Sequence, residues 1–251
     1  MKEAKKVAET LRVLKPIKVT AWRNDFTVNY EVVGSGGGGG VRSDIHELTK
    51  NSLRNMAFVA HNTSIDFELM VTLTYPKSYP SDGRQVKYHL KRFIKWMKEV
   101  KGVISFFWFM EFQRRGAPHF HIFTAGGNLL DMKKEVSQKW YDIVASEDPK
   151  HLLAGTRVEK LRHPEGAGRY ASKYASKPHQ KKIPEGYKNV GRWWGNSRDV
   201  TPKPLEVKEI DSWEELESLT QGWSHQGNVK RHVPMRTLFN ASRDVLGNDS
   251  E

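Results

Sequence analysis

The chain has 251 residues, enough for one large domain with a sizeable core, and its 37% hydrophobic and 11% aromatic content excludes a disordered protein. The lack of cysteine excludes disulfides and thiolate metal sites, and no apolar run is long enough to span a membrane. The net charge of +12 favours a polyanionic partner. The N-terminus lacks the apolar core of a secretory signal, so we expect a protein of the host-cell cytoplasm.

The first predicted elements surround a glycine run. Residues 1–14 alternate charged and aliphatic residues, as a short amphipathic helix does, and residues 18–33 are rich in β-branched and aromatic residues, which favours a strand or two. The run GSGGGGG at 34–40 lacks the Lys-Ser/Thr pair of a phosphate loop, so we interpret it as a flexible linker. Residues 43–62 have helical spacing behind a capping Ser-Asp pair.

The middle of the chain alternates between the periods of strands and helices. The predicted elements are, in chain order, a strand at 66–76, a helix at 83–100, two hairpin strands at 103–113 and 117–125, a helix at 129–146, a strand at 156–161, a helix at 167–177 and a last strand or ordered loop at 189–196. This order predicts an α+β fold, in which helices flank a mainly antiparallel central sheet.

We divide the chain into four parts. A helix and strand at 1–34 lead through a glycine-rich linker at 35–42 into the main domain at 43–198, and an acidic, helical or extended segment follows at 199–251. Basic residues gather in the main domain and predict contacts with nucleic acid. The candidates are Arg114, Arg115, Arg157, Lys160, Arg162, Arg169, Lys181, Lys182, Lys188, Arg192 and Arg198, with Trp193 and Trp194 either stacking on bases or packing in the core.

Two histidines and a glutamate form the first constellation that carries chemistry. Residues two apart on a strand point to the same face, so His119 and His121 share a face and Phe120 points away. Residues 114–116 would form a three-residue hairpin loop with glycine at the position that needs positive φ. This register puts Glu111 opposite His119, with Cβ atoms about 5 Å apart.

Two imidazoles and one carboxylate then converge, and water or substrate would fill the open positions. Nitrogen and oxygen ligands without sulfur suit a divalent cation that acts as a Lewis acid, for which we expect Mn²⁺ or Mg²⁺. Lone histidines on a strand usually just pack, but burying Glu111 beside them is costly unless something pairs with it. Pro118 lacks an N–H, which allows the register to shift by one residue.

The second constellation is a pair of tyrosines on the predicted helix at 167–177. Tyr170 and Tyr174 lie four apart and so on one helical face, and Lys173 and Lys177 follow each by three residues. Next to lysines and a metal-bound phosphate, a tyrosine could attack a phosphodiester and leave a phosphotyrosine and a free 3′-hydroxyl. An isolated tyrosine pair would simply pack; the basic helix and the upstream metal site favour chemistry.

Three stretches resemble, in order and spacing, the three motifs of rolling-circle replication initiators. They are MVTLTYP (70–76), GAPHFHIF (116–123) and YASKYASK (170–177). These initiators are HUH endonucleases, and the phage- and plasmid-encoded members are the most similar. The resemblance covers residues 66–198, where GRWWGNSR (191–198) also resembles a stretch that follows the tyrosine helix.

The resemblance implies a five-stranded antiparallel sheet flanked by helices and assigns roles to the candidate residues. Glu111, His119 and His121 would bind the cation, and Thr72 and Thr74 of the first motif would support the site from behind. Tyr174, which we rank first for its KYxxK setting, and Tyr170 would be the nucleophiles. Lys173 and Lys177 would help to position the scissile phosphate. The spacing does not choose between a one-tyrosine and a two-tyrosine enzyme.

The implied partner is single-stranded or hairpin origin DNA, nicked with a 5′-phosphotyrosine link and later rejoined. The chain has no Walker-type motif, so a host helicase and polymerase would be needed. Two alternatives remain. One is an HUH transposase or relaxase with the same chemistry. The other is a non-catalytic nucleic-acid-binding regulator with a structural metal.

Overall fold

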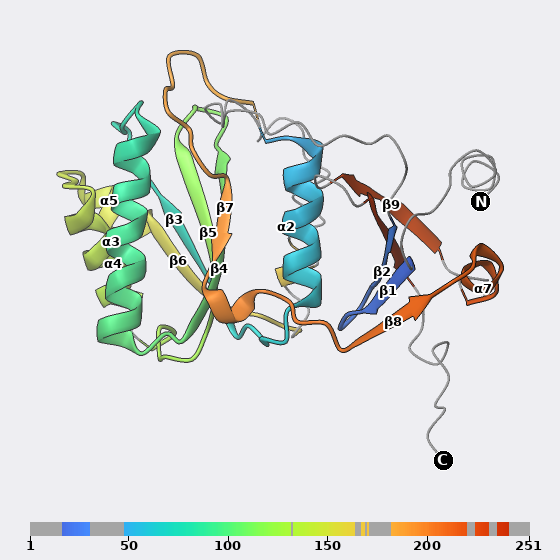
Figure 1. Cartoon of the computed structure of the whole chain (residues 1–251). Coiled ribbons are helices and arrows are strands. Elements are labelled where there is room, and N and C mark those ends of the chain that lie inside the picture. Colours follow the sequence, from blue (N-terminus) through green and yellow to red (C-terminus); the bar gives the residue numbers. More distant parts are fainter. Residues whose placement is uncertain are drawn as a thin grey trace. The chain divides into compact units, whose positions relative to one another are not determined.

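The structure is a computed structural model that describes residues 17–30, 48–131, 133–163, 167–168, 170, 182–219, 224–230 and 235–240. The chain divides into two compact units, which are labelled by element in Figure 1. We call residues 42–201 the central unit, and residues 1–41 with 202–251 the terminal unit. Each unit is described by itself.

The terminal unit contains a five-stranded antiparallel sheet in the order β8-β1-β2-β10-β9. Its apolar core gathers side chains of β1 and β2 with Ile210 and Leu216. The two strands predicted within 18–33 are therefore confirmed and form a hairpin. The elements are β1 (Ile17–Ala21), β2 (Phe26–Tyr30), β8 (Glu206–Ile210), α7 (Trp213–Leu219), β9 (Ser224–Lys230) and β10 (Met235–Asn240).

The central unit contains a second five-stranded antiparallel sheet, in the order β6-β3-β5-β4-β7. Helices flank this sheet, which confirms the predicted α+β fold (Figure 1). The strands are β3 (Leu69–Thr74), β4 (Ser105–Phe112), β5 (Pro118–Ala125), β6 (Thr156–Lys160) and β7 (Trp194–Asn196).

Local sequence signals begin and end the helices of the central unit. Asp82 caps α3 (Gly83–Lys101) by accepting a hydrogen bond from the Arg84 N–H, and Gly102 ends it in the left-handed conformation with φ of 68°. Thr49 caps α2 in the same way. The remaining helices are α2 (Lys50–Asn62), α4 (Lys133–Ile143), α5 (Pro149–Ala154) and the 3₁₀ helix η2 (Arg198–Val200).

Two apolar cores form on the two faces of this sheet. Helices α3 and α4 cover one face and α2 covers the other (Figure 1). Because side chains alternate along a strand, Phe120 enters the α3 core whereas Phe109 and Phe123 enter the α2 core. His119 and His121 belong to the same alternation as Phe123, so they lie on the α2 face of the sheet.

The β4–β5 hairpin has the register that the sequence predicts. Glu111 lies opposite His119, and Pro118 lies opposite Phe112 without a shift. Gly116 has φ of 83°, and its N–H donates to the Gln113 carbonyl across the turn. The short loop therefore fixes which residues of the two strands face each other.

Candidate active site

One pocket of about 310 Å³ brings the two predicted constellations together. It opens beside the tip of the β4–β5 hairpin. Its walls come from both hairpin strands and from the segment that carries Tyr170. The lining residues are Glu111, Phe112, Gln113, Arg114, His119, His121 and Tyr170.

A carboxylate and an imidazole meet on the floor of this pocket. Glu111 and His121 are only 6% and 8% exposed. Nε2 of His121 lies 2.7 Å from Oε1 of Glu111. This contact gives the buried carboxylate the partner that its burial requires.

Two threonines of β3 hold the outer nitrogens of the histidines. Strand pairing puts Thr74 opposite His119 and Thr72 opposite His121. The Thr74 hydroxyl lies 3.1 Å from Nδ1 of His119, and the Thr72 hydroxyl lies 3.4 Å from Nδ1 of His121. These contacts orient both rings and leave the Nε2 atoms for other partners, which is how histidines that bind metals are usually supported.

His119 is a neutral imidazole at physiological pH. Burial lowers its pKa to about 4, helped by nearby His121 and Arg115 and opposed by Glu111. The neutral ring keeps a nitrogen lone pair that can accept a hydrogen bond or bind a cation.

The donor set of Glu111, His119 and His121 has the chemistry of a divalent-cation site with open positions. Among the residues that the structure describes, however, no group of three or more His, Cys, Asp or Glu side chains is arranged as it would be around a metal ion. Glu111 is instead hydrogen-bonded directly to His121. The cation therefore stays a proposal.

Tyr170 stands over the histidine strand. Its ring centroid lies 5.7 Å from that of His121 and 5.8 Å from that of Phe123. Burial, and next the carboxylate of Glu159, raise the pKa of Tyr170, while Arg157 opposes them. The hydroxyl is thus a neutral phenol at physiological pH, within the pocket of the buried carboxylate and imidazoles.

The other predicted members of the tyrosine helix are not part of the described structure. Residues 167, 168 and 170 are helical, as predicted. The predicted positions outside the described residues are Arg169, Lys173, Tyr174, Lys177 and Lys181.

The two arginines of the hairpin tip differ in their surroundings. Arg115 donates to the carbonyls of Tyr75 and Pro76 at 2.6 and 2.7 Å and lies over the Tyr79 ring, so it ties the tip to the end of β3. Arg114 is exposed and lines the pocket. Arg114 is therefore the better placed of the two to meet a phosphate.

The two tryptophans also differ from each other. Trp193 is 2% exposed and packs edge-on against Phe112, so its faces are not accessible to a base. Trp194 is partly buried; its indole N–H donates to the Ser52 hydroxyl at 3.0 Å, and its ring packs against Phe107. Both rings thus contribute to the packing of the sheet.

The remaining predicted DNA contacts lie on the surface of the central unit. Arg157 is exposed on β6 and lies 2.7 Å from Glu159. The other exposed basic candidates are Lys160, Arg162, Lys182, Lys188, Arg192 and Arg198.

Two neighbours of the histidines do not stand out in the sequence. The side-chain amide of Gln113 lies 3.5 Å from Nδ1 of His119, and the ring of Phe109 lies 5.0 Å from that of His121. Both share the alternation of Glu111 along β4. Extending that alternation by two residues in each direction would have found them.

Residues 68–179 match a family model for replication-associated proteins of the ORF2 type. The match spans less than half of the chain and includes the β4–β5 hairpin, its two histidines and both tyrosines. It supports a role in the initiation of replication. No curated protein and no solved structure matches the chain. In the part of the chain that the structure describes, no helix has the length and apolar character needed to cross a membrane.

Proposed function

We propose that this protein is a rolling-circle replication initiator of the HUH endonuclease type, which nicks single-stranded origin DNA through a tyrosine. The observation that carries the proposal is the pocket shared by Glu111, His119, His121 and Tyr170. The match to a replication-associated family supports the biological setting. The basic surface of the central unit supports DNA as the substrate.

Glu111, His119 and His121 would hold a divalent cation, Mn²⁺ or Mg²⁺. When bound, the cation would supply positive charge to the oxygens of the scissile phosphate. The threonine hydroxyls at Nδ1 keep the two rings oriented for this role. Arg114, at the rim of the pocket, would bind the adjacent backbone phosphate.

The proposed reaction exchanges one phosphoester for another. The phenol oxygen of Tyr170 or Tyr174 attacks the scissile phosphorus, and the bond from phosphorus to the 3′-oxygen breaks. The tyrosine proton is lost and the 3′-oxygen takes up a proton, which leaves a 5′-phosphotyrosine and a 3′-hydroxyl. Attack by a later 3′-hydroxyl reverses the step and rejoins the strand.

The test uses a labelled pool of randomised single-stranded oligonucleotides, with the covalent adduct detected on a denaturing gel. We expect the full chain to form an adduct with Mn²⁺ present, and the double variant Tyr170→Phe/Tyr174→Phe to form none while still binding the pool. Each single variant shows whether one tyrosine is sufficient. Phenylalanine keeps the ring contacts of Tyr170 with His121 and Phe123, so it removes only the hydroxyl.

Adduct formation by the double variant would refute tyrosine attack. A wild-type chain that binds the pool but never forms an adduct would instead favour the non-catalytic regulator. Sequencing the trapped DNA would also give the preferred cleavage sequence. Tyr141, a partly buried tyrosine of α4 outside the pocket, supplies a control: Tyr141→Phe should leave the adduct unchanged.

A further inference from the structure

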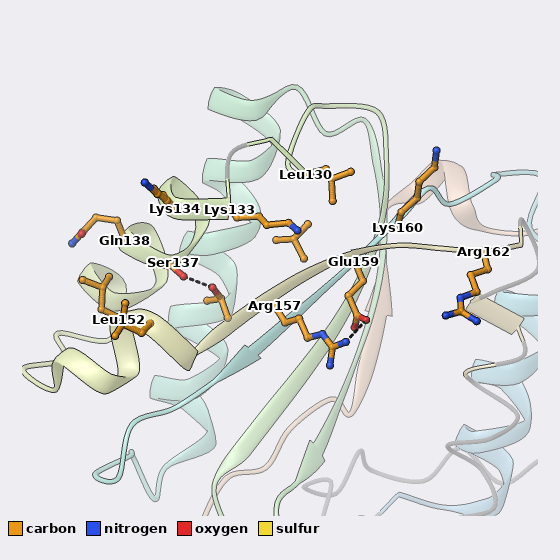
Figure 2. A pocket seen from close by; sticks show the side chains of 13 residues that line it. Leu130, Lys133, Lys134, Ser137, Gln138, Leu152, Arg157, Glu159, Lys160 and Arg162 are labelled. Carbon is orange, nitrogen blue, oxygen red and sulfur yellow. Dashed lines mark hydrogen bonds and ion pairs between the residues drawn. The ribbon is translucent and has the colours of Figure 1, made fainter.

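A second, larger hollow lies along β6, an edge strand of the central sheet. Its volume is about 850 Å³, and it is walled by α4, α5 and both sides of β6 (Figure 2). None of its lining residues belongs to the pocket of Tyr170. We call this hollow the β6 groove.

Positive charge dominates the β6 groove. It is lined by five basic side chains and a single acidic one, Glu159, which pairs with Arg157 at 2.7 Å (Figure 2). The four other basic side chains have no ion-pair partner among the residues that the structure describes. These four are Lys133, Lys134, Lys160 and Arg162. A groove with this balance attracts a polyanion.

The other lining residues indicate which polyanion fits. Leu130, Leu152 and Leu153 supply aliphatic surface, and Leu153 is 83% exposed. No aromatic side chain is among the described residues that line the groove. Grooves for unpaired strands normally combine charge with aromatic rings on which the bases stack. A duplex needs no such rings, because its bases already stack on one another and phosphates are its exposed face.

The β6 groove also adjoins the candidate active site through the sheet. Arg157 of β6 lies opposite Thr72 of β3, which lies opposite His121 of β5. Two strand spacings separate Arg157 from His121, which is about 10 Å. Arg157 and Glu159 point to one side of β6 and Lys160 to the other, so the basic lining continues around the sheet edge (Figure 2).

We propose that the β6 groove binds the phosphate backbone of a double-stranded DNA segment that adjoins the single strand in the pocket. The inference rests on the proposed function in taking DNA as the substrate. It adds that the protein holds the junction between paired and unpaired DNA. Lys133 and Lys134, at the start of α4, would contact phosphates on the side of the groove away from the pocket.

The experiment compares two fluorescent probes of equal length by anisotropy. One is a single strand, and the other is the same strand with half of its length paired to a complement. We expect Lys133→Ala/Lys134→Ala to bind the half-paired probe about tenfold more weakly, with a salt dependence whose slope is smaller by about two. Affinity for the single strand should stay unchanged. The matched control, Lys91→Ala/Lys95→Ala on the exposed face of α3, should bind both probes as the wild type does.

Unchanged affinity for the half-paired probe, or equal losses on both probes, would overturn the duplex assignment. The adduct assay provides a separate readout. The Lys133→Ala/Lys134→Ala variant should still form its covalent adduct with the single-stranded pool. If the wild type forms no adduct yet loses half-paired binding with these lysines, the nicking proposal fails and the groove proposal stands.

Discussion

The hydroxyl of Thr74 controls the orientation of a candidate ligand without entering the pocket. It lies 3.1 Å from Nδ1 of His119, whose ring is neutral at physiological pH. Thr74→Val keeps the shape of the side chain and removes this contact. We expect the affinity for Mn²⁺, measured by calorimetry on the full chain, to fall about 10- to 100-fold.

Thr72 supplies the matched control for this prediction. Its hydroxyl lies 3.4 Å from Nδ1 of His121, a longer contact, and His121 is also held by Glu111. Thr72→Val should therefore weaken Mn²⁺ binding less than Thr74→Val does. Wild-type affinity in the Thr74 variant would show that the hydroxyl does not support a ligand. A wild type that binds no Mn²⁺ would remove the cation from the proposal.

Lys87 of α3 carries its charge into the aromatic core on the other face of the sheet. Its ammonium lies 5.6 Å from the ring centre of Phe120 and 5.7 Å from that of Trp108, and it donates to the Val190 carbonyl at 3.2 Å. Burial lowers its pKa to about 7. Between that value and its ordinary pKa, the unfolded chain binds more protons than the folded chain, so stability must rise with pH.

We therefore expect the free energy of unfolding to rise from pH 7 to pH 9, by about 1 kcal/mol per pH unit from this group. Denaturant titrations at several pH values measure the slope. Lys87→Met keeps an unbranched side chain without the charge and should flatten the rise. Lys91→Met, on the exposed face of the same helix, should keep it. Equal slopes in the wild type and the Lys87 variant would mean that Lys87 is not desolvated.

At the scale of elements, the β4–β5 hairpin depends on one glycine. Gly116 has φ of 83°, and a Cβ atom there would lie 2.9 Å from the hydroxyl oxygen of Tyr79. That hydroxyl donates to the Arg115 carbonyl at 2.6 Å, so it cannot retreat without losing a hydrogen bond. We expect Gly116→Ala to destabilise the central unit by about 2 kcal/mol, with backbone strain and the contact both contributing.

Gly186 separates these two contributions. It has φ of 77°, but a Cβ atom there would meet nothing within 4 Å. Gly186→Ala should therefore cost only the backbone strain, about 1 kcal/mol. Chemical denaturation of both variants measures the difference. Equal losses would mean that Tyr79 moves aside freely.

The same hairpin explains why much of the candidate site could be predicted from the sequence. A loop of three residues leaves one register, and the alternation of β4 and β5 then puts Glu111 and His119 on one face. The contact of Thr74 with His119 depends on how β3 pairs with β5, across 45 residues of chain. No local pattern gives that register, so the threonines could be assigned only through a family resemblance.

The terminal sheet shows where sequence patterns stop being informative. β1 pairs with β8, and β2 pairs with β10, so its strands come from opposite ends of the chain. β8 reads EVKEI, with only its last residue buried, and its charged residues resemble a solvated loop or helix more than a strand. Hydrophobic periodicity predicts an element but not a partner so far away along the chain.

At the scale of the whole molecule, each unit has its own apolar core. The two cores of the central sheet contain only residues between Leu48 and Val200, and the core of the terminal sheet contains only residues outside that range. Neither sheet borrows a strand from the other. The central unit thus contains every described residue of the candidate site together with its supporting core.

This division predicts how truncation acts. Deleting residues 202–251 removes β8, β9 and β10 and would expose the core side chains of β1 and β2, so we expect that shortened chain to self-associate in size-exclusion chromatography. Deleting residues 1–41 as well removes the exposed hairpin, and the remaining 42–201 fragment should be monodisperse and unfold cooperatively. It should also form the covalent adduct. A fragment that fails to fold would mean that the central cores need the terminal unit.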